Sequence, residues 1–97
     1  MKVGFIGLGN VGGKLARSLL RNKFDLTVRD LDQNLNKTFI DLGAKVANSP
    51  KELAEQVDLI ITCLPSPKIC SDVMEGKHGV LNGLSQNKIW LEMSTTD

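Results

Sequence analysis

The chain has 97 residues, a length that suits one domain with a modest hydrophobic core and leaves no room for two. Apolar residues make up 41% of it and charged residues 24%, proportions that are typical of globular domains. The 12 basic and 11 acidic residues nearly cancel, which argues against a nucleic-acid partner, and no apolar run reaches the roughly 18–20 residues that cross a bilayer, which argues against a membrane partner.

The first predicted strand leads into the first predicted helix through a glycine-rich turn. Residues 2–6 form a short apolar run, which is typical of a strand buried on both faces of a parallel sheet. Val11, Leu15 and Leu19 then recur every four residues. This spacing predicts an amphipathic helix over Asn10–Arg21, with those three side chains on its apolar face.

The second strand and helix carry clearer boundary signals. Residues 26–28 are rich in strand-forming side chains. Asp32 is placed to cap the following helix, and Gly43 stands where the glycine that closes a helix belongs. The side chains expected to face the core from this helix are Leu35, Phe39 and Leu42.

The third helix has the strongest start signal in the chain. It follows a weak third strand over residues 44–47. Ser49 offers a capping hydroxyl, Pro50 suits the first helical position, and Glu52 completes a capping box. These residues predict a short helix that ends near Gln56.

A fourth strand and a fourth helix follow. Asp58–Cys63 predicts the strand, and residues 64–67 end it with two prolines. Ile69 and Val73 fit a short helix that Gly76 closes. One further helical turn is expected over residues 80–84 and a fifth strand over residues 88–93, and the core candidates across these strands are Phe5, Cys63 and Trp90.

The alternation of strands and helices predicts an α/β fold. Strands joined through helices pair in parallel by right-handed crossovers, which places helices on both faces of the sheet. The expected strand order is 3-2-1-4-5, a Rossmann-like sheet truncated before its last strand. Ligands bind such sheets at the carboxyl ends of the strands where the order reverses, here between the first and fourth strands. The loops at that edge are residues 7–12, 29–30, 63–67 and 94–97.

A G-x-G-x-x-G motif occupies the first of these loops. Gly7 permits the tight turn, Gly9 lets the backbone approach a pyrophosphate, and Gly12 lets the helix pack closely on the strand. The free amides and the positive end of the helix dipole would then meet the phosphates. The alternative is that the glycines are structural and the domain binds nothing or another nucleotide.

Asp30 follows the second strand, 18 residues after Gly12. A carboxylate at this place can accept hydrogen bonds from the adenosine ribose, and it would repel a 2′-phosphate. Leu31 brings no positive charge, although Arg29 is a candidate to reach such a phosphate. The pattern therefore favours NAD over NADP, while an aspartate that merely serves a turn is the alternative.

Residues 4–12 resemble the opening of the β-hydroxyacid dehydrogenases, the family of 3-hydroxyisobutyrate dehydrogenase and tartronate semialdehyde reductase. The resemblance continues in register through Ser49-Pro50, residues 58–65, residues 76–80 and residues 93–95. It therefore covers the whole chain, and it implies that residues 1–97 are the dinucleotide-binding domain of a 3-hydroxyacid oxidoreductase, without its helical second domain.

The resemblance also implies roles for single residues. Leu64 and Pro65 would run beside the cofactor, with Ile69 reaching it. Thr95 would contact the nicotinamide end, and Ser94 would bind the substrate carboxylate, although a solvated chain end is the alternative for Ser94. The full set of cofactor-binding candidates is Gly7, Leu8, Gly9, Asn10, Val11, Gly12, Arg29, Asp30, Leu64, Pro65, Ile69 and Thr95.

Several positions depart from the family pattern. Val11 stands where methionine is usual, Lys23 replaces a common glycine, and Glu92 replaces an aspartate. The family's catalytic lysine has no counterpart in residues 1–97, so we assign no catalytic residue and expect this chain alone to be inactive. The substrate of the parent protein would be a small hydroxy acid or its semialdehyde.

Other interpretations of the chain stay open. A non-catalytic dinucleotide-binding module of the same family would look the same over these residues. An interaction scaffold would pair the exposed edge of the fifth strand with another chain. A homo-oligomer also stays open for the parent protein. Because the chain opens on a strand with no leader, we expect a cytoplasmic location. Cys63 and Cys70 fit no common zinc or redox spacing, so no metal site is expected.

Overall fold

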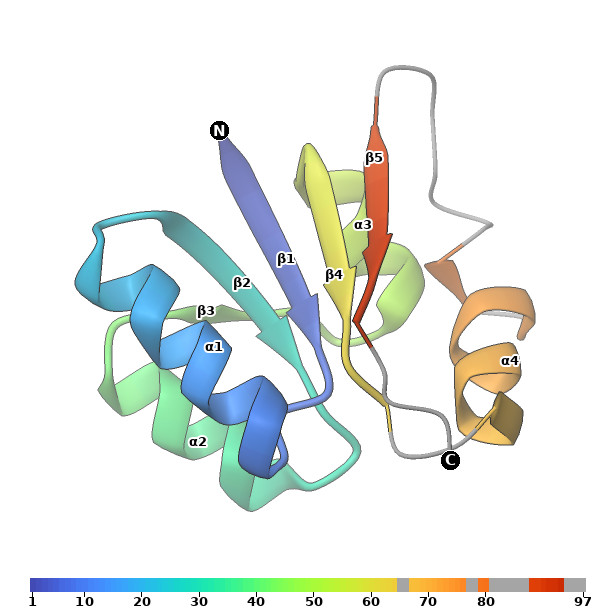
Figure 1. The fold of residues 1–97 in the computed structure, drawn as a ribbon, viewed down its shortest axis with the longest axis horizontal. Coiled ribbons are helices and arrows are strands. Elements are labelled where there is room, and N and C mark those ends of the chain that lie inside the picture. The colour runs from blue at the N-terminus through green and yellow to red at the C-terminus, as the bar shows by residue number, and fades with distance from the viewer. Residues whose placement is uncertain (65–66, 77–78, 81–87, 94–97) are drawn as a thin grey trace.

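The computed structural model describes residues 1–64, 67–76, 79–80 and 88–93. Figure 1 shows a parallel sheet with helices packed around it. The strands are β1 (Lys2–Ile6), β2 (Asp25–Arg29), β3 (Lys45–Val46), β4 (Leu59–Thr62) and β5 (Ile89–Glu92). The helices are α1 (Asn10–Arg21), α2 (Gln33–Asp41), α3 (Pro50–Gln56) and α4 (Pro67–Glu75). The predicted strands and helices over these residues are confirmed, and their bounds differ by only one or two residues.

The five strands of the described sheet lie in the order β3-β2-β1-β4-β5, as predicted. The register places the last residue of β1, Ile6, beside Arg29 of β2 and Thr62 of β4. The loops that follow these three strands therefore open at the same edge of the sheet, and the strand order reverses between β1 and β4. The Rossmann-like architecture puts the glycine motif at that edge.

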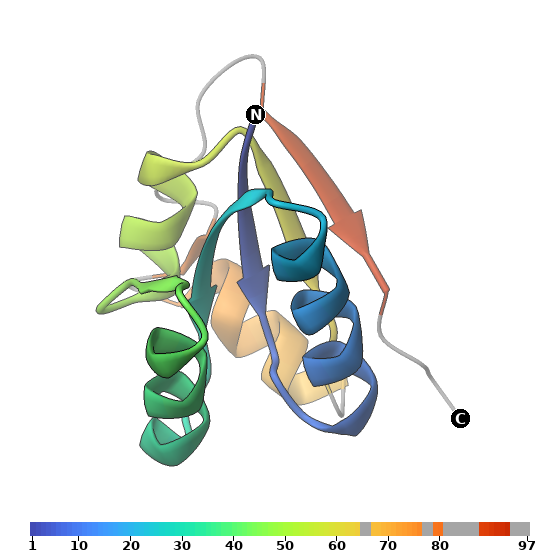
Figure 2. The same ribbon diagram turned by 90° about the vertical axis from the view of Figure 1, so that its left-hand side faces the viewer.

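Two apolar clusters, one on each face of the sheet, form the core. Alternate residues of a strand point to opposite faces, so Val3 and Phe5 join one cluster and Ile6 joins the other. α1 and α2 contribute to the first cluster, while α3 and α4 contribute to the second. Figure 2 views the sheet from its β3 side and shows α1 and α3 on opposite sides of it. The sheet is therefore covered on both faces, as the pattern predicts.

The predicted helix caps are present. The Asp32 side chain accepts a hydrogen bond from the Asn34 amide, and the Ser49 side chain accepts one from the Glu52 amide. Gly43 follows α2 with φ +104°, which is the left-handed backbone that closes helices. The local signals in the sequence thus fix where these helices begin and end.

Three predicted core side chains are exposed instead. Val11 is 56% exposed because it lies on the first turn of α1, beyond the edge of the sheet, and Leu42 is 50% exposed because it follows the last turn of α2. Trp90 is 43% exposed because β5 is the edge strand of the described sheet. Its indole N–H donates a hydrogen bond of 3.0 Å to the Thr62 hydroxyl, which ties the side chain to β4. Cys63 is only partly buried.

The helical turn over residues 80–84 lies outside the described residues except for Val80, which is fully buried. Among the described helices, none has the length and apolar character that a membrane span requires.

Candidate functional site

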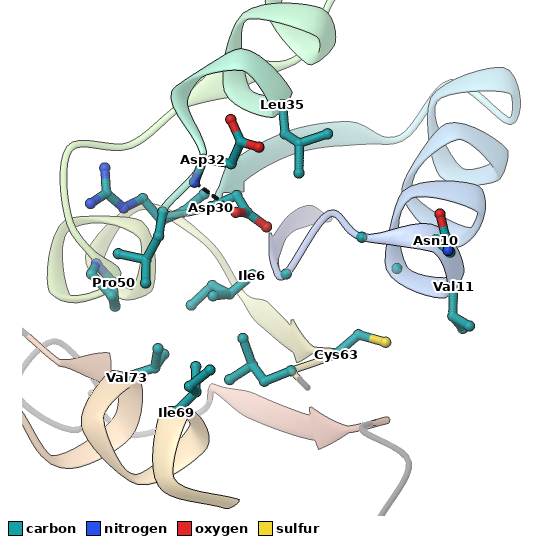
Figure 3. A pocket seen from close by; sticks show the side chains of 16 residues that line it. Ile6, Asn10, Val11, Asp30, Asp32, Leu35, Pro50, Cys63, Ile69 and Val73 are labelled. Carbon is teal, nitrogen blue, oxygen red and sulfur yellow. Dashed lines mark hydrogen bonds between the residues drawn. The ribbon is translucent and has the colours of Figure 1, made fainter. Parts of the chain in front are cut away.

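A cavity of about 500 Å³ lies at the carboxyl ends of β1, β2 and β4. Figure 3 shows it between α1, which carries Asn10 and Val11, and α4, which carries Ile69 and Val73. The cofactor-binding candidates that line this cavity are Gly7, Gly9, Asn10, Val11, Gly12, Arg29, Asp30, Leu64 and Ile69. The structure thus brings together three of the four predicted loops at this edge.

The remaining candidates do not line the described cavity. The Leu8 side chain is buried in the core, so only its backbone belongs to the glycine loop. Pro65, Ser94 and Thr95 lie outside the described residues. The substrate-binding candidate and the candidate for the nicotinamide end therefore stay predictions.

The three motif glycines meet different surroundings. Gly7 has φ +101°, and a Cβ on it would lie 2.1 Å from the Cys63 carbonyl oxygen. A Cβ on Gly12 would lie 2.0 Å from the Gly7 carbonyl oxygen, so α1 and the turn touch at this point. A Cβ on Gly9 would meet no heavy atom within 4 Å. Two of the glycines are required by packing within the chain, whereas the third leaves open space beside the start of α1.

The N-terminus of α1 has no side-chain cap. Its N-cap is Gly9, no acidic residue stands in the first turn, and the Gly13 amide makes the bond to the Gly9 carbonyl oxygen. The amides of the first turn therefore face outward with the positive end of the helix dipole. A helix start of this kind binds anionic groups, phosphates above all.

Asp30 lies across from this helix start, at the end of β2. Its carboxylate accepts a hydrogen bond of 2.7 Å from the Leu8 amide and another of 2.8 Å from the Asp32 amide, the second of which is drawn in Figure 3. A carboxylate has about four acceptor sites, so two bonds fix its orientation and leave acceptor capacity for a ligand hydroxyl. Asp30 thus connects the glycine loop to the turn that begins α2.

Apolar side chains form much of the rest of the cavity lining. Leu31 and Leu35 lie beside Asp30, Pro50 lies at the start of α3, and Ile69 and Val73 lie on α4. The sequence pattern predicts helices at Pro50 and Val73 but does not place either residue in the site. The signal was available, because both helices begin at the carboxyl edge of the sheet, where ligands bind.

Cys63, which follows β4, also lines the cavity. Burial raises the pKa of its thiol, and the negative charge of Glu92 raises the pKa further. The thiol stays protonated at neutral pH, so it is a poor nucleophile. Among the described residues, no group of three or more His, Cys, Asp or Glu side chains is arranged to hold a metal ion.

This geometry fits a dinucleotide. The open space at Gly9 and the uncapped amides of α1 suit a pyrophosphate, the Asp30 carboxylate suits a ribose, and the apolar part of the lining suits a planar base. Residues 2–97 match the family model described as the NAD binding domain of 6-phosphogluconate dehydrogenase. The chain belongs to this family.

Individual proteins of known name agree with the assignment. The chain is 39% identical over 95 residues to mitochondrial 3-hydroxyisobutyrate dehydrogenase of Mus musculus, and the match covers 98% of this chain and 28% of that protein. The solved 3-hydroxyisobutyrate dehydrogenase of Salmonella typhimurium superposes with a TM-score of 0.87 at 27% identity, over 98% of this chain and 33% of that one. The resemblance to the β-hydroxyacid dehydrogenases is confirmed.

A third match is a solved structure that contains a nicotinamide dinucleotide. Psf3, solved in complex with NADP⁺ and 2-OPP, superposes with a TM-score of 0.90 at 26% identity, over 97% of this chain and 34% of that one. The chain thus spans about a third or less of the length of the proteins that it matches. It corresponds to the nucleotide-binding part of those proteins.

Proposed function

We propose that the cavity binds a nicotinamide dinucleotide with its pyrophosphate at the start of α1. The observation that carries this proposal is the uncapped first turn of α1, with open space at Gly9, facing a cavity of about 500 Å³. Backbone amides at a helix start supply hydrogen bonds and a favourable dipole without needing a basic side chain.

The adenosine end would lie between β2 and α4. Asp30 would accept hydrogen bonds from the ribose hydroxyls, and the adenine would pack against Leu31, Pro50, Ile69 and Val73. A 2′-phosphate would meet the negative charge of Asp30, and Leu31 offers it no positive partner. NAD is therefore the proposed cofactor. Among the described residues that line the cavity, Arg29 is the only cation.

The parent protein would be an oxidoreductase for a short 3-hydroxy acid or its semialdehyde. The name of the mouse relative supports this substrate class. The bound cofactor would supply hydride chemistry, while the residues of this chain would bind and orient it. No residue of the chain is assigned to the proton step, so we propose that the chain alone turns over no substrate. A cytoplasmic location stays a prediction, and the mouse relative is named as mitochondrial.

The decisive experiment is a titration of the folded 97-residue chain with NADH and NADPH, followed by fluorescence of the bound nicotinamide. We expect saturable binding of both coenzymes at concentrations up to millimolar, with the lower dissociation constant for NADH. Folding is checked in the same samples by circular dichroism. A folded chain that binds neither coenzyme at millimolar concentration overturns the proposal, and tighter binding of NADPH overturns the preference for NAD.

A further inference from the structure

Asn36 is a buried polar side chain in the middle of α2. It is 2% exposed, and asparagine is a poor helix former because its amide competes for backbone hydrogen bonds. Alanine or leucine at the same position would have a better helix propensity. The contacts of the Asn36 amide indicate what it does there.

The Asn36 amide pairs with both backbone groups of Asp30. Its Oδ1 accepts a hydrogen bond of 2.9 Å from the Asp30 amide, and its Nδ2 donates one of 2.8 Å to the Asp30 carbonyl oxygen. The same Nδ2 also lies 3.2 Å from Oε1 of Gln33. These two hydrogen bonds from a buried side chain therefore fix the backbone of the turn that follows β2.

Asp30 connects this fixed turn to the glycine loop. Its carboxylate accepts the 2.7 Å hydrogen bond from the Leu8 amide, which lies between Gly7 and Gly9. Glycines on both sides give this short segment more backbone freedom than other residues would allow. A hydrogen bond to a charged carboxylate is about twice as strong as one between neutral groups, so it is suited to hold such a segment.

We propose that Asn36 is a positioning residue for the dinucleotide site, acting through Asp30 on the glycine loop. By fixing the backbone of Asp30, it fixes where the carboxylate meets the Leu8 amide and how the loop presents the first turn of α1. The proposal rests on the proposed function for its effect on binding. Its effect on the loop itself can be measured without any cofactor.

The first test is hydrogen exchange of the Leu8 amide in the free chain. Asn36→Ala should speed that exchange about fivefold or more, since the bond that protects the amide loses its support. The matched control is Thr38→Ala on the same helix, which removes an exposed hydrogen bond from the Thr38 hydroxyl to the Asn34 carbonyl oxygen. That control should leave Leu8 exchange unchanged. Unchanged Leu8 exchange in folded Asn36→Ala overturns the proposal.

The second test is a double-mutant cycle on the dissociation constant for NADH. Asn36→Ala should raise it about fivefold in the natural chain and should add nothing in the Asp30→Ala background, because residues that act through one contact are not additive. Independent, additive effects contradict action through Asp30. All titrations are made well below the unfolding temperature of each variant, so that lost stability alone leaves the dissociation constant unmoved.

Asn36→Asp serves if Asn36→Ala fails to fold. It keeps the size and one acceptor but replaces the donor to the Asp30 carbonyl oxygen with an acceptor, so the same faster Leu8 exchange is expected. Absence of NADH binding to the natural chain refutes the proposed function and leaves the exchange experiment to decide the role of Asn36.

Discussion

α1 and α2 cover the same face of the sheet and end in the same way, yet they begin differently. Both end in a Schellman motif with matching hydrogen bonds. The amides of Lys23 and Phe24 bond the carbonyl oxygens of Leu20 and Leu19 after α1, and those of Gly43 and Ala44 bond Ile40 and Phe39 after α2.

The two helices differ in how their N-termini are capped. α2 is capped by the Asp32 side chain, whereas α1 has a glycine at the same position and no side-chain cap. Capping stabilises a helix by satisfying amides that are otherwise open, so an uncapped start forgoes stability. The open start of α1 is the feature on which the proposed pyrophosphate site depends.

The largest expected effect comes from adding a side chain where α1 packs against the glycine turn. Gly12→Ala would place a Cβ 2.0 Å from the Gly7 carbonyl oxygen, which forces the helix away from the turn. We expect the free energy of unfolding to fall by about 3 kcal/mol, a large fraction of the stability of a domain of this size. Urea denaturation followed by circular dichroism measures it. A loss below about 1 kcal/mol would show that the contact yields easily, contrary to this account.

Gly9→Ala should separate binding from folding. The new methyl group meets no heavy atom within 4 Å, and Gly9 has an extended backbone with φ −67°, so the fold tolerates it. We expect the free energy of unfolding to change by less than about 1 kcal/mol. The methyl group would occupy the approach of the pyrophosphate, so the dissociation constant for NADH should rise about tenfold, which is about 1.4 kcal/mol. Equal affinity in the variant and the natural chain would place the phosphates elsewhere.

Ser49→Ala removes a cap from a helix at the same edge of the sheet. The hydrogen bond from the Glu52 amide to the Ser49 hydroxyl is lost, so the free energy of unfolding should fall by about 1 kcal/mol. The dissociation constant for NADH should stay within twofold, as judged by the same titration. A marked loss of affinity would mean that the start of α3 also contacts the phosphates.

Much of the fold, and part of the candidate site, could be predicted from the sequence. The caps at Asp32 and Ser49 and the closing Gly43 carry local signals, because cap geometry depends on neighbouring residues. The three motif glycines carry a signal in their spacing. The alternation of apolar runs with helical patterns predicts the strands, and the rules for parallel α/β sheets predict their order. These features position the glycine loop and the carboxylate of Asp30 at one edge.

The rest depends on contacts between distant parts of the chain. Trp90 looks like a core residue, but its exposure depends on what lies beyond the edge strand. Asn36 does not fit the apolar pattern of its helix, and only the fold shows that its amide meets the backbone of Asp30. Val73 enters the site because α4 turns it toward the cavity, as Figure 3 shows.

The smallest expected effect is a gain in stability at the end of α1. Lys23 has φ +65° at the position where Gly43 has φ +104°, and a left-handed backbone costs a residue with a side chain about 1–2 kcal/mol. Glycine avoids that cost but loses more freedom on folding, so Lys23→Gly should raise the free energy of unfolding by about 0.5–1 kcal/mol.

The mirror substitution tests the same argument. Gly43→Ala adds a methyl group with no heavy atom within 4 Å, so only backbone strain can act, and stability should fall by about 1 kcal/mol. Both variants are measured by thermal and urea denaturation, with NADH affinity as a control that neither should change. If Lys23→Gly destabilises the chain, then the lysine side chain makes a contribution that outweighs the strain. Opposite signs for the two variants would show that the two helices share one closing motif, in which α2 has glycine and α1 has a strained lysine.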